Sequence, residues 1–257
     1  MAVEMFSEER QEAILQLLKR ENKLTVQRIC EEFNVSPATV RNDLNDMARK
    51  DLLIRTHGGA MLRQRVGIEL TNQQKQIKNV EEKKRIAQEA LTMINDGDTL
   101  AIDTGTTTMI FSETLTAKKN LTILTNDLKI ALMLEENTNF TVIVIGGILR
   151  KRYSCALGPM SIAGLKSFRV DKAFLGANGI TADAGFTTPN IYHAEYKRTL
   201  VEISNETIVL STGNKLGVNS FTTFAHAKDI HTIITDTSAP SSEVTALRNM
   251  DVDIRMV

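Results

Sequence analysis

The stretch that decides the fold spans residues 24–60. It reads Leu24-Thr25-Val26, then Phe33-Asn34-Val35-Ser36-Pro37-Ala38-Thr39-Val40-Arg41-Asn42-Asp43-Leu44, then Leu52-Leu53-Ile54-Arg55-Thr56-His57-Gly58-Gly59-Ala60. Apolar residues at helical spacing form two short runs, interrupted just before Ser36. Ser36 is a good helix N-cap and Pro37 suits the first helical position, so a new helix should begin there. The pattern predicts a helix over 25–33, a tight turn and a second helix over 37–50.

A further helix and a hairpin complete the predicted N-terminal domain. Residues 7–20 have an amphipathic pattern with their apolar side chains on one face. Residues 52–54 favour a short strand and residues 56–59 a turn, so a hairpin should follow the helix pair. A hairpin in that position is a wing, which lies along DNA phosphates or in a minor groove. We expect residues 1–62 to form an α+β winged helix-turn-helix domain.

The second helix of the pair has a polar face that suits the DNA major groove. Its apolar residues Val40, Leu44 and Met47 can face the core while the polar residues face outward. Arginine prefers the guanine edge in the major groove, and asparagine the adenine edge. The residues expected to form the reading surface are Ser36, Thr39, Arg41, Asn42 and Asn45, and those expected to hold phosphates are Arg55, His57 and the amide of Gly58.

Charge is distributed unevenly along the chain. The whole sequence has 31 basic and 31 acidic side chains, yet residues 36–65 carry six cations against three carboxylates. A local basic face is what contact with phosphates requires. The alternative is a solvated helix face, and charge alone would favour that alternative. Asp43 is expected to pair with a basic group of its own domain, or to stabilise the helix, rather than to touch DNA.

The bulk composition is that of a globular protein with one large or two moderate domains. The chain has 257 residues, of which 42% are apolar and 24% charged, enough to bury a core without disulfides or metal. Its two cysteines, Cys30 and Cys155, are far apart and lack metal-ligand spacing, which indicates a reducing compartment. The charged N-terminus is unlike a signal peptide, and the longest apolar run, near 142–149, is too short to span a bilayer. We expect a cytoplasmic protein without a metal site, a cofactor or a membrane partner.

Beyond the wing the sequence pattern changes twice. Residues 63–80 are rich in Gln, Lys and Arg and are expected to be a linker that is helical in part. Residues 81–257 alternate short apolar runs with amphipathic segments, which predicts an α/β domain with a mostly parallel sheet. Its strands are expected at 99–102, 121–125, 140–145, 172–176, 206–211, 230–235 and 252–256, and its helices at 81–95, 107–117, 127–136, 193–203 and 240–249.

Three turns of this domain have the composition of anion-binding turns. The first follows the strand at 99–102, where Gly105 lets the backbone approach a ligand and the next helix offers free amides and threonine hydroxyls. It lacks a Walker lysine, so nucleotide hydrolysis is not expected. Each turn alone is compatible with a purely geometric use of Gly and Thr, but at the ends of neighbouring strands the turns would converge on one crevice. The candidate effector-binding residues in these turns are Asp103, Gly105, Thr106, Thr107, Thr108, Thr125, Asn126, Gly146 and Gly147.

Further candidates for the effector site lie in later segments, and they are Arg152, Asn178, Glu195, Lys197 and Lys215. Arg152 belongs to a basic run that suits either a phosphate dianion or solvent. Glu195 and Lys197, on a predicted helix, form either a surface pair or part of the site. Lys215 follows a strand within a Gly/Asn loop, a suitable place for a ligand contact. His193 is expected at a helix start and is given no chemical role.

Two blocks of the chain resemble the DeoR family of bacterial transcription regulators. Residues 7–62 match its N-terminal domain at Arg10, Ile14, Leu17-Leu18, Val26, Phe33-Asn34-Val35-Ser36, Thr39-Val40-Arg41, Asp43-Leu44, Ile54-Arg55 and His57-Gly58-Gly59-Ala60. Residues 81–236 match its effector domain at Gly97-Asp98, Asp103, Gly105-Thr106-Thr107, Thr125-Asn126, Gly146-Gly147, the run 171–180, Gly185-Phe186-Thr187-Thr188, Lys197-Arg198 and Lys215. The resemblance implies an effector domain with a fold like that of ribose-5-phosphate isomerase and the CoA transferases.

Two functions follow from these observations. The resemblance implies a repressor of a sugar-utilisation operon, a homo-oligomer (dimer or tetramer) that binds double-stranded operator DNA and is released by a phosphorylated sugar; a corepressor or activator role stays open. The alternative is a sugar-phosphate isomerase with an attached DNA-binding module. Aldose–ketose isomerisation needs a general base and groups that stabilise an enediolate. The segment 175–179 has no carboxylate, which leaves Glu195 as a lone base. The sequence therefore favours binding without turnover, and we expect no enzymatic activity.

Overall fold

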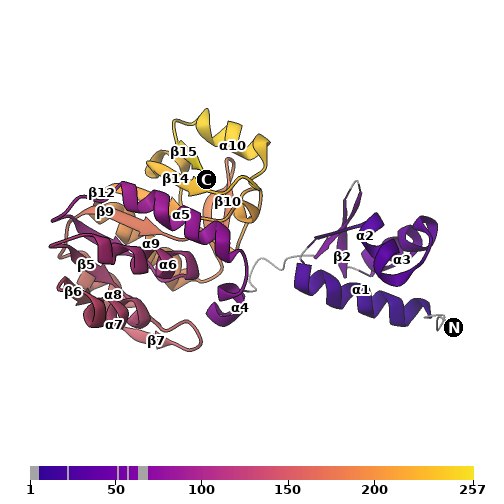
Figure 1. Ribbon diagram of the computed structural model, residues 1–257, viewed down its shortest axis with the longest axis horizontal. Coiled ribbons are helices and arrows are strands. Elements are labelled where there is room, and N and C mark those ends of the chain that lie inside the picture. Colours follow the sequence, from indigo (N-terminus) through magenta and orange to yellow (C-terminus); the bar gives the residue numbers. More distant parts are fainter. Residues whose placement is uncertain (1–5, 22, 51, 57, 63–68) are drawn as a thin grey trace. The chain divides into compact units, whose positions relative to one another are not determined.

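The computed structural model describes residues 6–21, 23–50, 52–56, 58–62 and 69–257. The chain divides into two compact units, unit 1 (Met1–Arg65) and unit 2 (Val66–Val257), which are drawn in Figure 1. Unit 1 has one apolar core, and unit 2 has one on each face of its sheet. The fold class expected from the sequence is confirmed, since unit 1 is a winged helix-turn-helix and unit 2 is an α/β domain around a parallel sheet.

Unit 1 packs helices against an antiparallel sheet of three strands in the order β1-β3-β2. Its elements are α1 (Ser7–Glu21), β1 (Lys23–Thr25), α2 (Val26–Phe33), α3 (Pro37–Arg49), β2 (Leu53–Thr56) and β3 (Gly59–Leu62). The helices follow the predicted ranges closely. The sequence does not predict β1, because three residues are too few to display an alternating pattern.

The wing meets the start of α2 at a point of close backbone approach. A Cβ atom added at Gly59 would lie 1.9 Å from the carbonyl oxygen of Leu24, so a larger residue would force the strands apart. One residue earlier, the carbonyl of Gly58 accepts the backbone N–H of Val26 at 2.8 Å. The wing is thereby tied to the helix-turn-helix rather than hanging free of it.

The turn between α2 and α3 is fixed by residues that cap the two helices. Asn34 ends α2 in a left-handed conformation with φ 49°, which asparagine tolerates well. The hydroxyl oxygen of Ser36 accepts the backbone N–H of Thr39 at 3.2 Å, and Pro37 occupies the first turn. The cap predicted at Ser36 is confirmed.

A buried ion pair joins α1 to α3. Nε of Arg10 lies 2.6 Å from Oδ2 of Asp43, and both side chains are almost inaccessible to solvent. The hydroxyl of Ser7 donates to the other carboxylate oxygen at 2.8 Å. The prediction that Asp43 has a basic partner within its own domain is confirmed.

Unit 2 is built on a sheet of seven parallel strands in the order β15-β14-β12-β9-β4-β5-β6. The strands are β4 (Thr99–Ile102), β5 (Thr122–Thr125), β6 (Thr141–Val144), β9 (Val170–Leu175), β12 (Ser204–Leu210), β14 (Thr232–Thr235) and β15 (Asp253–Met256). The main helices are α5 (Val80–Thr92), α6 (Thr106–Thr114), α7 (Leu128–Asn137), α8 (Pro159–Leu165), α9 (Ile191–Ile203) and α10 (Ser241–Arg248). All seven predicted strands and all five predicted helices are present, within a few residues of the expected bounds.

Each face of this sheet has its own core, because alternate strand residues point to opposite sides. Leu100 and Ile102 pack with residues of α5, α6 and α7, whereas Ala101 packs on the side of α8, α9 and α10. The rings of Phe111 on α6 and Phe174 on β9 have centroids 4.4 Å apart. The helices on both faces, visible in Figure 1, bury the sheet and leave its strand ends to the loops.

Smaller elements that the sequence does not predict follow the main strands. They are the hairpin β7 (Ile148–Arg150) and β8 (Cys155–Leu157), and the antiparallel strands β10 (Gly179–Thr181), β11 (Gly185–Thr188) and β13 (Thr222–Ala225). The short helix α4 (Asn72–Gln76) agrees with the expectation that residues 63–80 are helical in part. Helix α4 lies within the stretch expected to be a linker, and it packs against α6 of unit 2. No helix in the part of the chain that the structure describes is long and apolar enough to cross a membrane.

Candidate functional site

The polar face of α3 is solvent-exposed, as the sequence predicts. Arg41, Asn42 and Asn45 are exposed, whereas Val40 and Leu44 on the opposite side have no accessible surface. This separation leaves a row of polar side chains on one side of a helix that is anchored by its apolar side. Such a helix presents donors and acceptors without disturbing its own packing.

The remaining DNA-binding candidates have more specific local roles. The hydroxyl of Ser36 caps α3 and also lies 2.9 Å from the hydroxyl of Thr39, so both are engaged at the helix start. Nη1 of Arg55 donates to the carbonyl of Gly59 at 2.8 Å, which fixes the guanidinium on the wing. Gly58 is exposed. His57 lies outside the described residues.

In unit 2, a buried carboxylate stands at the carboxyl end of β4. Oδ2 of Asp103 accepts the backbone N–H of Gly176 at 3.2 Å and forms an ion pair with the ammonium of Lys197. The other carboxylate oxygen, Oδ1, lies 2.8 Å from Nε2 of His193. Lys197 also donates to the carbonyl of Gly176 at 2.7 Å. Two predicted site residues, Asp103 and Lys197, are thus brought together, and His193 joins them although the sequence analysis gave it no role.

The charges in this cluster are strongly coupled. Burial alone would raise the pKa of Asp103, but the ammonium of Lys197 and then the imidazole of His193 hold that pKa far below its ordinary value. Burial, together with the positive charge of Lys197, lowers the pKa of His193. The imidazole is therefore neutral near pH 7, and its Nε2 hydrogen points at the carboxylate.

This tautomer leaves Nδ1 of His193 as a hydrogen-bond acceptor. Nδ1 is buried and has no hydrogen-bond partner among the described residues. Oδ1 of Asn126, at the end of β5, is in the same position, while its amide nitrogen donates to the carbonyl of Ala156 at 2.9 Å. Buried acceptors of this kind are costly unless something donates to them, and the hydroxyls of a sugar are suitable donors.

The loop between β4 and α6 also has the expected anion-binding features. Helix α6 begins at Thr106, and the amides of its first turn have no acceptor within the helix. The hydroxyl of Thr108 donates back to the carbonyl of Gly105 at 3.0 Å and so shapes the turn. Thr107 is half-buried, so it is accessible in part. The hydroxyl of Thr104 donates to Asp127 at 2.5 Å and joins this loop to the end of β5.

Two partly buried lysines of unit 2, Lys83 and Lys215, feel the positive charge of neighbouring lysines. Burial and the charges of Lys215 and Lys75 lower the pKa of Lys83 to about 8. Burial and the charges of Lys75 and Lys78 lower the pKa of Lys215 to about 8. Nζ of Lys83 donates to the carbonyl of Lys75 at 2.6 Å. Cations that repel one another in a partly buried place favour a bound anion.

Lys215 is among the residues predicted from the sequence, whereas Lys83 is not, although the sequence carries a signal for it. Lys83 precedes Ile86 and Ala87 by three and four residues, which places it on the buried face of α5. A lysine at a core-facing helical position is uncommon unless it has a partner. That anomaly alone would have marked it as a candidate.

Five of the predicted site residues do not join the cluster in the way expected. Glu195 lies two residues from both His193 and Lys197 on α9, so its side chain points from the other side of the helix. Arg152 is exposed at the tip of the β7–β8 hairpin, and it is Arg150 that turns inward. The other three residues shape the backbone of their turns. The hydroxyl oxygen of Thr125 accepts the backbone N–H of Asp127. The turn formed by Gly146 and Gly147 packs on Ser161.

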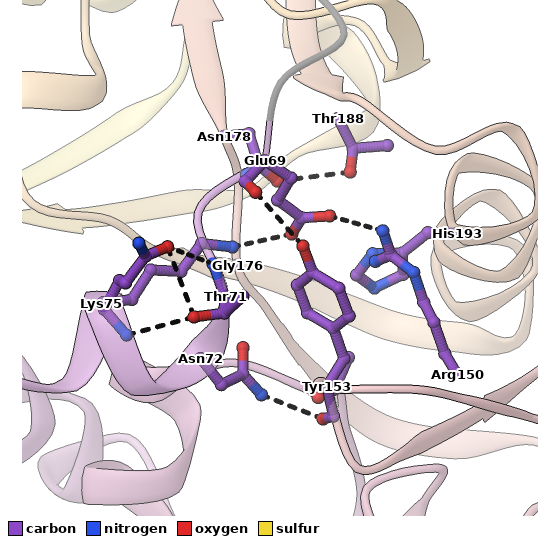
Figure 2. A network of polar contacts seen from close by, with 12 residues as sticks. Glu69, Thr71, Asn72, Lys75, Arg150, Tyr153, Gly176, Asn178, Thr188 and His193 are labelled. Carbon is purple, nitrogen blue, oxygen red and sulfur yellow. Dashed lines mark hydrogen bonds and ion pairs between the residues drawn. The ribbon is translucent and has the colours of Figure 1, made fainter.

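Asn178 lies beside the cluster rather than inside it. Its side-chain oxygen accepts the hydroxyl of Thr188 at 3.2 Å, and its backbone N–H donates to the carbonyl of Thr187. Figure 2 shows Asn178 and Thr188 near Gly176 and His193, together with a polar network around Glu69 and Arg150. The carboxyl ends of β4, β5 and β9, which are neighbours in the sheet, thus gather the carboxylate of Asp103, the ammonium of Lys197 and two acceptors that have no partner among the described residues.

Comparisons with known proteins match both units of the chain. A family model described as the DeoR C terminal sensor domain matches residues 78–237, and one described as the DeoR-like helix-turn-helix domain matches residues 10–66. The HTH-type transcriptional regulator YulB of Bacillus subtilis, described as uncharacterized, is 31% identical over 98% of both chains. The glycerol-3-phosphate regulon repressor of Escherichia coli is 30% identical over 96% of this chain and 98% of its own. A solved D-ribose-5-phosphate isomerase in complex with phospho-erythronic acid is 19% identical, with a TM-score of 0.41 over 53% of this chain and 54% of its own.

Proposed function

Because the chain belongs to the DeoR family of transcriptional regulators, we propose that it represses a carbohydrate-utilisation operon and leaves its operator when it binds a phosphorylated sugar. Unit 1 binds double-stranded DNA, and unit 2 holds the effector at the carboxyl ends of β4, β5 and β9. The E. coli relative is named for a glycerol-3-phosphate regulon, and that name supports a small phosphorylated polyol or sugar as the effector class here.

The DNA half of the proposal rests on the exposed face of α3. The base edges are read by Arg41, Asn42 and Thr39. The DNA phosphates next to these bases are held by Arg55 and by the backbone amide of Gly58. Two subunits of a homo-oligomer, a dimer or a tetramer, place their α3 helices in successive major grooves, about 34–36 Å apart. His57 is proposed as a further phosphate contact.

Two observations in unit 2 support the sensing half, namely partly buried lysines that repel one another and buried acceptors that have no partner among the described residues. Lys83 and Lys215 supply charge for a phosphate, and the first amides of α6 supply hydrogen bonds. Nδ1 of His193 and Oδ1 of Asn126 supply acceptors for hydroxyls. A phosphorylated sugar has both a phosphate dianion and hydroxyl groups. An unphosphorylated sugar lacks the dianion, and an inorganic anion lacks the sugar hydroxyls.

The arrangement supports binding without turnover. Aldose–ketose isomerisation requires a general base that is free to take a proton from carbon. Asp103 is held by Lys197 and His193, which keep its pKa far too low for that role. Glu195 points from the other side of α9. Conversion of ribose 5-phosphate or fructose 6-phosphate that disappears in Glu195→Gln would favour an enzyme instead.

Isothermal titration calorimetry tests the sensing half directly. Ribose 5-phosphate, fructose 1-phosphate, fructose 6-phosphate, tagatose 6-phosphate and glycerol 3-phosphate are titrated beside their unphosphorylated parents. We expect at least one phosphate ester to bind, its parent to fail, and Lys215→Ala to lose the binding. Failure of every phosphate ester to bind the wild-type protein would remove this half of the proposal.

A further inference from the structure

The carboxylate of Glu69 in unit 2 already lies between two cations, Lys75 and Arg150. The side chain of Glu69 is only 6% exposed and forms two ion pairs. Its Oε1 lies 2.6 Å from Nζ of Lys75, and its Oε2 lies 2.7 Å from Nη2 of Arg150. Figure 2 shows the carboxylate turned toward Arg150, with His193 behind the guanidinium. The two cations overcome the effect of burial and lower the pKa of Glu69, so it is ionised at neutral pH.

The segment that carries Glu69 is fastened to the β7–β8 hairpin at several points. The hydroxyl of Tyr153 donates to the carbonyl of Glu69 at 3.3 Å, and Nδ2 of Asn72 donates to the carbonyl of Tyr153 at 2.9 Å. The guanidinium of Arg150 lies 3.8 Å from the ring centroid of Tyr153. Each contact is a polar or stacking contact, and none of them buries a large apolar side chain. Contacts of this kind hold the segment in one position, but the segment can still detach from the hairpin reversibly.

The charge of Glu69 acts on residues proposed to bind the effector. Burial and the neighbouring lysines lower the pKa of Lys215, while Glu69 opposes that shift. Burial and Lys197 lower the pKa of His193, and Glu69 is among the anions that oppose this shift too. The ion pair with Lys75 connects Glu69 to the lysines, and Figure 2 shows His193 behind the guanidinium that Glu69 holds. A phosphate dianion placed among the same cations would repel Glu69.

One donor near Glu69 remains unused. Nη1 of Arg150 is buried and has no acceptor among the described residues, whereas Nη2 holds Glu69. The carboxylate of Glu69 has two oxygens. One pairs with Lys75 and the other with Nη2 of Arg150, so neither is left for Nη1. Phosphate has three terminal oxygens and binds guanidinium in a bidentate manner, so it can satisfy both Nη groups at once.

We propose that the carboxylate of Glu69 is an intramolecular ligand of the effector site, and that the phosphate group of the effector displaces it from Arg150 and Lys75. This inference rests on the proposed function of unit 2. Glu69 lies four residues beyond Arg65, at the boundary of unit 1. Displacement releases the described segment 69–76 from the hairpin, so this segment is freed when effector is bound. A ligand that binds the released state better shifts the population toward it.

The effect of neutralising Glu69 on phosphate affinity distinguishes a competing carboxylate from one that contacts the ligand. Glu69→Gln keeps the shape of the side chain but removes the competing charge. We expect the variant to bind inorganic phosphate and the effective phosphate ester about tenfold more tightly than wild type. Glu69→Asp keeps the charge and should bind like wild type or within a fewfold of it. Unchanged or weaker binding in Glu69→Gln would overturn the proposal, since a carboxylate that contacts sugar hydroxyls would lose affinity when neutralised.

A matched substitution controls for the general loss of an ion pair. Glu89 on α5 pairs with Arg255 at 3.1 Å and takes no part in the cluster, so Glu89→Gln should leave phosphate affinity unchanged. Amide hydrogen exchange over residues 71–78 gives a second readout. We expect exchange there to rise when wild type binds the phosphate ester and to be high already in Glu69→Gln. Protection of the segment on binding would contradict displacement.

The outcomes also separate this inference from the proposed function. Binding of a phosphate ester to wild type with no gain in Glu69→Gln overturns the inference and leaves the effector site standing. Binding to Glu69→Gln alone supports competition by Glu69 but removes the proposed sensing role of the wild type. Absence of binding to both proteins overturns both statements.

Discussion

Nε2 of His193 lies 2.8 Å from Oδ1 of Asp103, and this hydrogen bond joins the first turn of α9 to the carboxyl end of β4. Asn190 caps α9 by accepting the amide of His193, which holds the imidazole at that place. Lys197, one turn further along the helix, closes the cluster from the same side. A single buried carboxylate thus positions both a cation and a neutral imidazole at the proposed effector site.

Removal of Lys197 should be strongly destabilising. Lys197→Met leaves the carboxylate of Asp103 buried with a neutral imidazole as its remaining side-chain partner, and breaking a buried pair costs about 3–5 kcal/mol. The double variant Asp103→Asn/Lys197→Met should recover most of that loss, because it leaves no buried charge. Urea denaturation of the two proteins measures both values. A loss below about 1 kcal/mol in Lys197→Met would contradict the coupling described for this cluster.

Effector affinity should fall as the pH rises through about 8. Lys83 and Lys215 both have a pKa lowered to about 8, and only their ammonium forms attract a phosphate dianion. A phosphate ester has a second pKa of about 6, so it is mostly a dianion at pH 7 and gains little charge by pH 9. A fall in affinity over this range therefore comes from the protein. Calorimetric titrations at pH 7 and pH 9 should show clearly weaker binding at the higher pH, and Lys83→Met/Lys215→Met should bind weakly at both. Equal affinity of the wild type at the two pH values would contradict the assignment.

The same lysines should make the free protein more stable as the solution becomes alkaline. Their folded pKa values lie below the ordinary value of 10.5, so the unfolded chain binds these protons more tightly. The free energy of unfolding therefore rises between about pH 8 and pH 10.5 from this contribution. Bound phosphate removes the repulsion, so the stabilisation that it gives should be larger at pH 7 than at pH 9. Thermal unfolding with and without the phosphate ester measures the difference.

Arg41 should carry base specificity in the DNA contact. Arg41→Ala should cost about 1–3 kcal/mol of binding free energy and relax the preference at one base position. Arg49 is exposed at the end of the same helix and pairs with Asp46, so Arg49→Ala is a matched control that keeps the preference. Fluorescence anisotropy on duplexes selected from a random library compares the variants. An unchanged preference in Arg41→Ala would remove it from the reading surface.

Asp43 should support DNA binding only through the stability of unit 1. Burial opposes the shift, but hydrogen bonds from Arg10 and Ser7 lower the pKa of Asp43. The stability that this pair contributes is present above the unfolded pKa of about 3.9 and is lost as the pH falls below it. Asp43→Asn should lower the melting temperature of unit 1 and weaken DNA binding in parallel. Weaker DNA binding with an unchanged melting temperature would indicate a direct contact instead.

The elements that the sequence predicts well are those specified by local signals. Ser36 and Pro37 mark the start of α3 because a cap needs only neighbouring residues, and β4 is found at 99–102 because the apolar run is short and bounded. Strand β1 is missed because its pairing with β3 depends on a distant backbone, where Gly59 lets the strands meet.

The proposed effector site is predictable only in part, for a related reason. Asp103 and Lys197 follow from strand ends and helix positions, but the role of His193 depends on which face of α9 meets β4. The choice between Arg150 and Arg152 is decided by the turn of the hairpin, where Arg152 takes a φ of 72°. Glu69 gives no local signal, since its partners lie 6 and 81 residues away in the chain.

The most direct measurement is DNA binding titrated with effector. The full chain is bound to its selected duplex, and the phosphate esters and their unphosphorylated parents are added while fluorescence anisotropy is followed. We predict that one phosphate ester lowers the DNA affinity of the wild type, that its parent does not, and that Thr106→Ala and Lys215→Ala bind the duplex normally but no longer respond. A duplex held with the same affinity in the presence of every phosphate ester would contradict the account.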